Sequence, residues 1–143
     1  MLNFVTTTQE DLPLLKNWID ADSWHQNKES IEWWLRGYLS FKLVDDRGTT
    51  VFVRFDREGD LVRLHSQFAT TEEVSEARVA LSISEAIPRF IECTKRDGVK
   101  GIVTESVSPK LVAFLQARLG FEYSGAGNDY VLNFDDLEPA KSV

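Results

Sequence analysis

The segment from Ser108 to Phe121 constrains the fold more than any other part of the sequence, because it has the features of one complete helix. Ser108 is a favourable N-cap residue, and Pro109 suits the first helical position, where its missing N–H costs nothing. Gly120 predicts a left-handed residue that ends the helix, and we expect Phe121 to turn back onto the core. The apolar residues between these ends recur at helical spacing, at Leu111, Val112, Leu115 and Leu119.

The rest of the chain alternates strand and helix patterns around this segment. Strands are expected at 2–6, 41–44, 50–55, 61–68, 101–107 and 129–134, and helices from Thr8 and at 30–39, 74–96 and 109–119. A polar turn is expected at 56–60, and the glycines at 125–127 can divide the last strand in two. The resulting order, β-α-α-β-β-β-α-β-α-β, predicts an α/β (α+β) fold with a mixed sheet and helices on both faces.

Length, charge and cysteine content narrow the class of protein. A chain of 143 residues predicts a single domain at 1–137, followed by a tail at 138–143. The net charge of −7 argues against nucleic-acid binding, and no apolar run reaches the roughly 20 residues needed to cross a bilayer. With no signal-peptide pattern and one cysteine, we expect a cytoplasmic protein in which the Cys93 thiol is buried and no metal is bound.

The helix that ends in Leu119-Gly120-Phe121 after a core strand resembles the C-terminal third of GNAT-type N-acetyltransferases. The order of elements is also similar to that family over nearly the whole chain. The resemblance implies a mixed, mostly antiparallel, twisted sheet and transfer of an acetyl group from acetyl-CoA to an amine of a small molecule or a protein. In the family, acetyl-CoA binds where the strands that correspond to 61–68 and 101–107 splay apart.

The resemblance also implies which residues contact acetyl-CoA: Gln67, Phe68, Ala69, Arg78, Val79, Ala80 and Ser108. The family binds the diphosphate at the start of the helix that follows strand 61–68, where backbone N–H groups and the helix dipole favour an anion. This sequence departs from the family's [Q/R]-x-x-G-x-[G/A] loop, because Arg78 takes the place of the glycine and Ser75 that of the Gln or Arg. Acidic residues also surround this helix start, at Glu72, Glu73 and Glu76.

His65 is the leading candidate for a general base. It lies on the polar face of strand 61–68, between Arg63 and Gln67, and an imidazole can take a proton from an ammonium group near neutral pH. Glu105, near the end of the next strand, is a second candidate. A hydrogen-bonded surface histidine and an exposed strand carboxylate are the alternatives for these two residues.

The general acid of the family is a tyrosine at the position of Gln116, which has no dissociable proton. Ser108 and Tyr123 are possible substitutes, although Ser108 is also explained as a helix cap and Tyr123 as a strand aromatic.

The acceptor amine is assigned by the resemblance to the first helical region and the polar face of strand 61–68, with Trp24, His25 and Arg63 as candidate contacts. Two alternatives to an acetyltransferase stay open. The missing glycine loop and tyrosine fit a GNAT-fold domain that has lost catalysis and binds another protein or a second copy of itself. An unrelated α/β fold with the same element order is the other.

Overall fold

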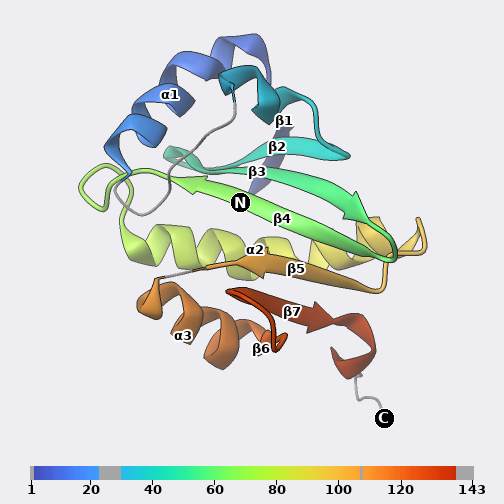
Figure 1. Cartoon of the computed structure of the whole chain (residues 1–143). Helices are drawn as coiled ribbons and strands as arrows, with labels where there is room; N and C mark the ends of the chain where they lie inside the picture. Colours follow the sequence, from blue (N-terminus) through green and yellow to red (C-terminus); the bar gives the residue numbers. More distant parts are fainter. Residues whose placement is uncertain (1, 23–29, 107, 138–143) are drawn as a thin grey trace. The chain divides into compact units, whose positions relative to one another are not determined.

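A computed structural model describes residues 2–22, 30–106 and 108–137 (Figure 1). The strands are β1 (Asn3–Thr6), β2 (Leu39–Asp45), β3 (Gly48–Glu58), β4 (Leu61–Phe68), β5 (Gly101–Glu105), β6 (Glu122–Tyr123) and β7 (Asp129–Asn133). The helices are α1 (Leu12–Ala21), α2 (Glu76–Lys95) and α3 (Pro109–Leu119), with 3₁₀ turns at Gln9–Asp11, Ile31–Leu35 and Phe134–Leu137. The strand order β1-β2-β3-β4-β5-β7-β6 confirms the predicted mixed, mostly antiparallel sheet.

The chain divides into two compact units that share β4 and α2. The first unit comprises Met1–Asp56 and His65–Ala86, and the second comprises Arg57–Leu64 and Ile87–Val143. A single domain at 1–137 therefore stays a prediction, and the predicted tail at 138–143 lies outside the described residues.

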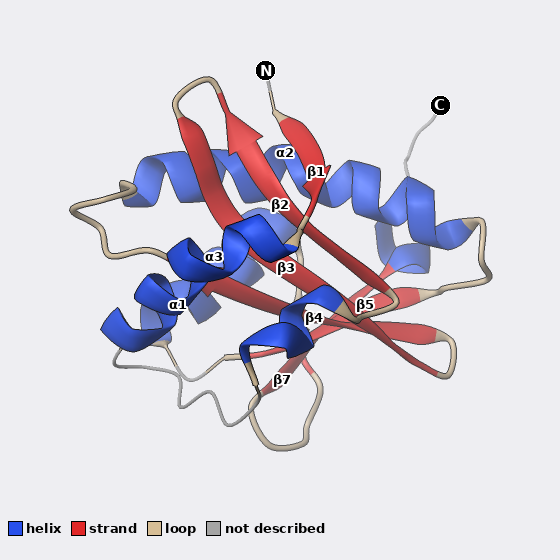
Figure 2. Cartoon of the chain, turned by 90° about the horizontal axis from the view of Figure 1, so that it is seen from above, coloured by secondary structure: helices blue, strands red, loops and turns tan. Residues whose placement is uncertain are grey.

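The first unit has its core between α1 and the sheet. Helix α1 follows a turn in which the Asp11 carboxylate accepts the Thr8 N–H at 2.9 Å, so the predicted helix start is confirmed. The Trp18 ring meets the edge of Phe52 at 5.1 Å between ring centres. The buried cluster consists of Leu12, Leu15, Trp18, Trp34, Phe52 and Val74. In Figure 2, α1 and α2 lie on opposite sides of β2 and β3, as the predicted layering requires.

The predicted helix at 30–39 is wrong, because only the 3₁₀ turn Ile31–Leu35 forms before β2 begins at Leu39. The chain passes against β3 at Gly37, where an added Cβ would lie 2.7 Å from Arg54 Cγ and 2.8 Å from the Phe55 carbonyl oxygen. The Gly37 N–H also donates to Ser40 Oγ at 3.0 Å. This close approach to β3 is a tertiary requirement that overrides the helical spacing.

Helix α2 buries Ile87 and Phe90 of the predicted stripe Val79, Ile83, Ile87 and Phe90. Its buried residues include Ser82 and Thr94, whereas Val79 and Ile83 are half-buried. Hydrogen bonds explain the two buried hydroxyl groups: Thr50 Oγ1 lies 2.9 Å from Ser82 Oγ, and Thr94 donates to the Phe90 carbonyl at 2.7 Å. Cys93 is exposed on this helix, so the predicted buried thiol is wrong.

The second unit contains the segment from Ser108 to Phe121, which folds as predicted. Ser108 Oγ accepts the Leu111 N–H at 3.4 Å, and Gly120 has a φ of 82°. The Phe121 N–H donates to the Leu115 carbonyl at 3.0 Å, and the Phe121 side chain is buried. The last strand is divided, as expected, into β6 and β7.

Strand β4 pairs with β5 over only its first half. The parallel register runs from Leu61↔Gly101 to Leu64↔Thr104, which is four of the eight residues of β4. At the last pair the Thr104 hydroxyl donates to the Leu64 carbonyl at 3.1 Å. The Leu64 carbonyl, at the end of the β4–β5 pairing, thus accepts a hydrogen bond from a side chain.

Candidate active site

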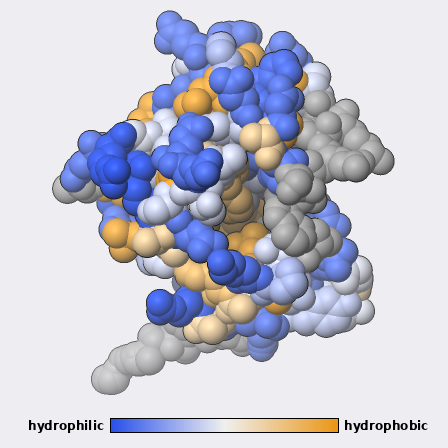
Figure 3. Space-filling model, turned by 90° about the vertical axis from the view of Figure 1, so that its left-hand side faces the viewer, coloured by the Kyte–Doolittle hydropathy of each residue, from blue (hydrophilic) through white to orange (hydrophobic). Residues whose placement is uncertain are grey.

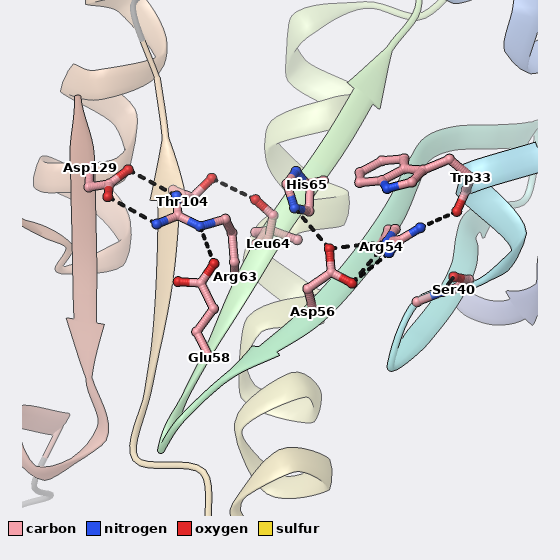
Figure 4. A network of polar contacts seen from close by, with 11 residues as sticks. Trp33, Ser40, Arg54, Asp56, Glu58, Arg63, Leu64, His65, Thr104 and Asp129 are labelled. Carbon is pink, nitrogen blue, oxygen red and sulfur yellow. Dashed lines mark hydrogen bonds and ion pairs between the residues drawn. The ribbon is translucent and has the colours of Figure 1, made fainter. Parts of the chain in front are cut away.

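His65 belongs to a ring of four interacting side chains in the first unit (Figure 4). The imidazole Nε2 lies 3.2 Å from Asp56 Oδ2. Arg54 and Asp56 are two residues apart on β3 and therefore project from the same face. The Arg54 guanidinium donates hydrogen bonds to the Asp56 carboxylate. Its Nε lies 3.0 and 3.1 Å from the two Asp56 oxygens, and its Nη2 lies 2.8 Å from Oδ1.

Trp33 closes the ring on the other side. The Arg54 guanidinium carbon lies 3.9 Å from the centre of the Trp33 ring, and Arg54 Nη1 donates to the Trp33 carbonyl. The same indole meets the His65 ring edge-on, with 4.9 Å between ring centres and 83° between planes. The His65 side chain remains 32% exposed, so an imidazole held in this way can still exchange a proton with a bound molecule.

The sequence analysis does not predict Asp56 and Arg54 as partners of His65. The predicted turn at 56–60 is wrong at Asp56, because β3 continues to Glu58 and places Asp56 on the strand. The alternation of Arg54 and Asp56 along an extended strand was the available signal.

Glu105, the second candidate base, is exposed at the end of β5 in the second unit. Its register partner in β7 is Asp129, so two carboxylates lie opposite each other there. Asp129 is bound by Arg63, and this ion pair compensates one of the two charges.

Arg63, a candidate acceptor contact, is held by two carboxylates of the second unit (Figure 4). Its Nη1 and Nη2 donate to Asp129 at 2.9 and 3.0 Å, and its Nε donates to Glu58 at 2.7 Å. The hydrogen bonds to Asp129, followed by that to Glu58, raise the pKa of Arg63, and Arg63 in turn lowers the pKa of Asp129. This guanidinium is therefore already paired with carboxylates. Trp24 and His25, the other acceptor candidates, lie outside the described residues.

Gln67, a candidate acetyl-CoA contact, is a buried polar residue of β4 and is 2% exposed. Its amide donates to Asp22 Oδ2 at 2.9 Å and to the Phe68 carbonyl at 3.2 Å. Asp22 is the C-terminal cap of α1. The Gln67 side chain thus joins the second half of β4 to the end of α1, and Phe68 and Ala69 follow it half-buried.

Arg78, another candidate for acetyl-CoA, pairs with the end of β2 rather than with the start of its own helix. Its Nε and Nη2 lie 2.9 and 2.7 Å from the two Asp45 oxygens. The Arg78 backbone N–H donates to Ser75 Oγ at 3.3 Å, and the nearby Glu73 carboxylate accepts from Trp18 Nε1 at 2.8 Å. Val79 and Ala80, which complete this candidate set, are half-buried in the first turns of α2.

The Asp45–Arg78 pair should make stability depend on acid pH. Hydrogen bonds from Arg78, aided by the Arg47 N–H, lower the pKa of Asp45 from 3.8 to about 2. A lowered carboxyl pKa stabilises the fold at pH values above 3.8, and this contribution is lost as the pH falls toward 2. Asp45→Asn should therefore reduce the free energy of unfolding by about 0.5–1 kcal/mol at pH 7, and by much less at pH 2.

Urea unfolding at both pH values measures this difference, with Asp20→Asn as the matched control. Asp20 pairs with Lys16 at 2.7 Å, but the two side chains are 60% and 65% exposed, so its loss should cost less than about 0.5 kcal/mol at either pH. Equal costs for the two substitutions at pH 7 would contradict the assignment.

The hydroxyl groups proposed as general acids both make local hydrogen bonds. Ser108 Oγ caps α3, and Tyr123 OH donates to the Gly127 carbonyl at 2.9 Å. Tyr123 is 52% exposed, so its hydroxyl also remains open to solvent.

Two kinds of feature are absent from the part of the chain that the structure describes. Within 2–22, 30–106 and 108–137, no three His, Cys, Asp or Glu side chains are grouped so as to hold a metal ion. Within the same ranges, no helix has the length and apolar character that crossing a bilayer requires.

Solved structures with the same architecture are numerous, although no family model and no curated protein sequence matches the chain. The ribosomal-protein-S18-alanine N-acetyltransferase of Escherichia coli is 16% identical, with 94% of each chain covered and a TM-score of 0.63. A GNAT family acetyltransferase of Staphylococcus aureus Mu50 is 11% identical, with 94% of this chain and 99% of that chain covered and a TM-score of 0.67. The chain has the GNAT fold.

Another GNAT family acetyltransferase was solved with acetyl-CoA. This Brucella melitensis acetyltransferase is 13% identical, with 94% of this chain and 88% of that chain covered and a TM-score of 0.61. At these identities the likeness confirms the predicted GNAT fold and excludes the alternative of an unrelated α/β fold. The role of each candidate residue depends on the geometry of this chain.

Proposed function

We propose that this GNAT-fold protein transfers an acetyl group from acetyl-CoA to an amine, with His65 as the proton acceptor. The main observation behind this proposal is the His65 imidazole on the second half of β4, which is 32% exposed and lies 3.2 Å from Asp56. A histidine that only filled the surface would not need a carboxylate, a guanidinium and an indole arranged around it. The GNAT fold of the chain and the acetyl-CoA in the Brucella melitensis structure support the choice of acyl donor.

The proposed reaction is a direct attack by the amine nitrogen on the thioester carbonyl carbon. His65 takes the proton that the amine must lose, directly or through a water molecule. Backbone N–H groups of 65–68 stabilise the negative charge that develops on the carbonyl oxygen. The C–S bond then breaks, the acetyl group stays on the amine, and the thiolate of CoA takes a proton from solvent.

The acyl donor is proposed to bind along the backbone of 65–69 and at the first turns of α2. The pairing of β4 with β5 ends at Leu64, which is consistent with a ligand that adds to the following residues as a strand would. Arg78 is the one basic candidate in this set, and a diphosphate must compete with Asp45 for its guanidinium.

The acceptor is proposed to be a small-molecule or peptide amine. A net charge of −7 favours a cationic acceptor over an anionic one. A homodimer and a cytoplasmic location stay predictions. The large exposed apolar residues Val5, Leu14, Leu81 and Tyr123 come from four different elements, and Figure 3 shows apolar atoms interspersed with hydrophilic ones on one face.

A test of the proposed function combines binding and turnover with the purified chain. Acetyl-CoA at 100 times its dissociation constant should stabilise the native state by about 2.7 kcal/mol, which is visible as a rise in melting temperature. A panel of amines that includes polyamines, amino acids and peptide N-termini should then release free CoA thiol with at least one acceptor. If millimolar acetyl-CoA causes no melting shift and no amine leads to thiol release, the proposal is overturned. That result would favour a catalytically inactive binding module.

A further inference from the structure

We propose that Asp56 is a positioning residue that keeps the proton of neutral His65 on Nε2, so that Nδ1 is the atom that accepts the proton of the amine, and that Arg54 holds Asp56 in place from its stack on Trp33. This inference rests on the proposed function for its catalytic meaning. The arrangement of the four side chains can nevertheless be tested without any substrate.

The first step is the contact between the imidazole and the carboxylate. An ionised carboxylate only accepts hydrogen bonds, so a nitrogen 3.2 Å from Asp56 Oδ2 is the one that carries the hydrogen. The nitrogen that faces Asp56 is Nε2. In the neutral ring the lone pair is then on Nδ1, because a hydrogen bond to one ring nitrogen sets the tautomer of the other.

The second step is the charge balance among His65, Asp56 and Arg54. A carboxylate alone beside a histidine favours the protonated imidazole, which cannot accept a proton. Here Arg54 binds the same carboxylate through three contacts of 2.8 to 3.1 Å. The guanidinium offsets the charge of Asp56, and His65 Nε2 still lies 3.2 Å from the carboxylate. The Arg54–Asp56 pair therefore orients the imidazole of His65.

The third step is the rigidity of Arg54. Its side chain is 11% exposed, stacks on the Trp33 ring and donates to the Trp33 carbonyl. Gly37 leaves room for it, because a Cβ at that position would lie 2.7 Å from Arg54 Cγ. The guanidinium is thus fixed from the 3₁₀ turn at Ile31–Leu35 and from the loop that follows it. An ordinary exposed ion pair has no such support.

The direct experiment is long-range ¹H–¹⁵N NMR of the imidazole nitrogens in the full chain. The protein has two histidines, and the spectrum of His65→Gln identifies which signal belongs to His65. At a pH where the ring is neutral, we expect Nε2 to have the shift of a protonated nitrogen and Nδ1 that of an unprotonated one. A neutral ring with its hydrogen on Nδ1 would overturn the proposal.

Two variants separate positioning from simple structural support. Asp56→Asn can offer its amide N–H₂ to Nε2, so it should move the ring toward the Nδ1–H tautomer and lower the pKa of His65. Arg54→Met leaves the Asp56 charge uncompensated, so it should raise the pKa of His65. The Asp20→Asn control should change neither quantity. If the tautomer and the titration of His65 are unchanged in both Asp56→Asn and Arg54→Met, the proposal is overturned. If Asp56→Asn does not fold, Arg54→Met alone still tests it.

The kinetic consequence is a loss of turnover with little change in donor binding. Asp56→Asn should lower kcat by roughly 10- to 100-fold while the KM for acetyl-CoA stays within about twofold. An unchanged kcat in an active enzyme would overturn the positioning role. If no variant, including the wild type, turns over acetyl-CoA, the NMR result still decides the geometry, and it is the proposed function that fails.

Discussion

Replacing His65 by glutamine is expected to lower kcat/KM for acetyl transfer by roughly 100- to 1,000-fold, which is the range for loss of a general base. Glutamine keeps a polar side chain on β4 but cannot take the amine proton at neutral pH. The fall should shrink as the pH rises, because a growing fraction of the acceptor is then already an uncharged amine. Steady-state release of CoA thiol between pH 6 and pH 10 measures both effects.

Glu105→Gln is the matched variant, because Glu105 is the other candidate base and is exposed at the end of β5. We expect it to keep kcat/KM within roughly threefold of the wild type, as for a residue outside the catalytic machinery. A large loss in Glu105→Gln with a small loss in His65→Gln would transfer the role to Glu105. The melting shift with acetyl-CoA should be retained in both variants, because the backbone of 65–69 is unchanged.

Phe52→Ala is expected to cost about 3–5 kcal/mol of unfolding free energy. Phe52 is 0% exposed and packs edge-on against Trp18, so alanine would leave a cavity between β3 and α1. The substitution should also change the fluorescence of the native state, because the environment of an indole changes. Urea denaturation followed by tryptophan fluorescence gives both quantities.

Leu81→Ala serves as the comparison for this core substitution. Leu81 is 61% exposed on α2, so its truncation should change the unfolding free energy by less than about 0.5 kcal/mol. Similar costs for the two variants would contradict the packing described for the first unit.

The parts of the fold that the sequence predicts well are those determined by local chemistry. Helix α3 is the clearest case, because Ser108, Pro109 and Gly120 each act within one turn of their own position. The order of strands and helices is also local in origin, since each element has its own periodicity. Together with the helix end at Leu119-Gly120-Phe121, that order carries the resemblance to the GNAT family, although no family model and no curated protein sequence matches the chain.

The errors arise where distant residues meet. Gly37 ends a helical pattern because β3 passes beside it, and α2 buries the polar Ser82 because Thr50 provides a hydrogen-bond partner for it. Neither contact can be deduced from the segment that it changes.

The candidate site was predictable only in part, for the same reason. The alternation of polar and apolar residues in 61–68 places His65 on the polar face of a strand, but the sequence predicts a turn at its partner Asp56, which lies on β3. Arg63 and Asp129 are 66 positions apart in the sequence. Nothing in the residues around Arg63 therefore indicates that its guanidinium pairs with a carboxylate.

Titration of the ¹⁵N-labelled protein with acetyl-CoA tests the central claim most directly, because backbone amide shifts report where a ligand binds. We expect saturable shifts centred on the amides of 65–69 and 76–80, with desulfo-CoA and acetyl-CoA perturbing the same set. An absence of saturable shifts at millimolar acetyl-CoA, or saturable shifts confined to other residues, would contradict the account.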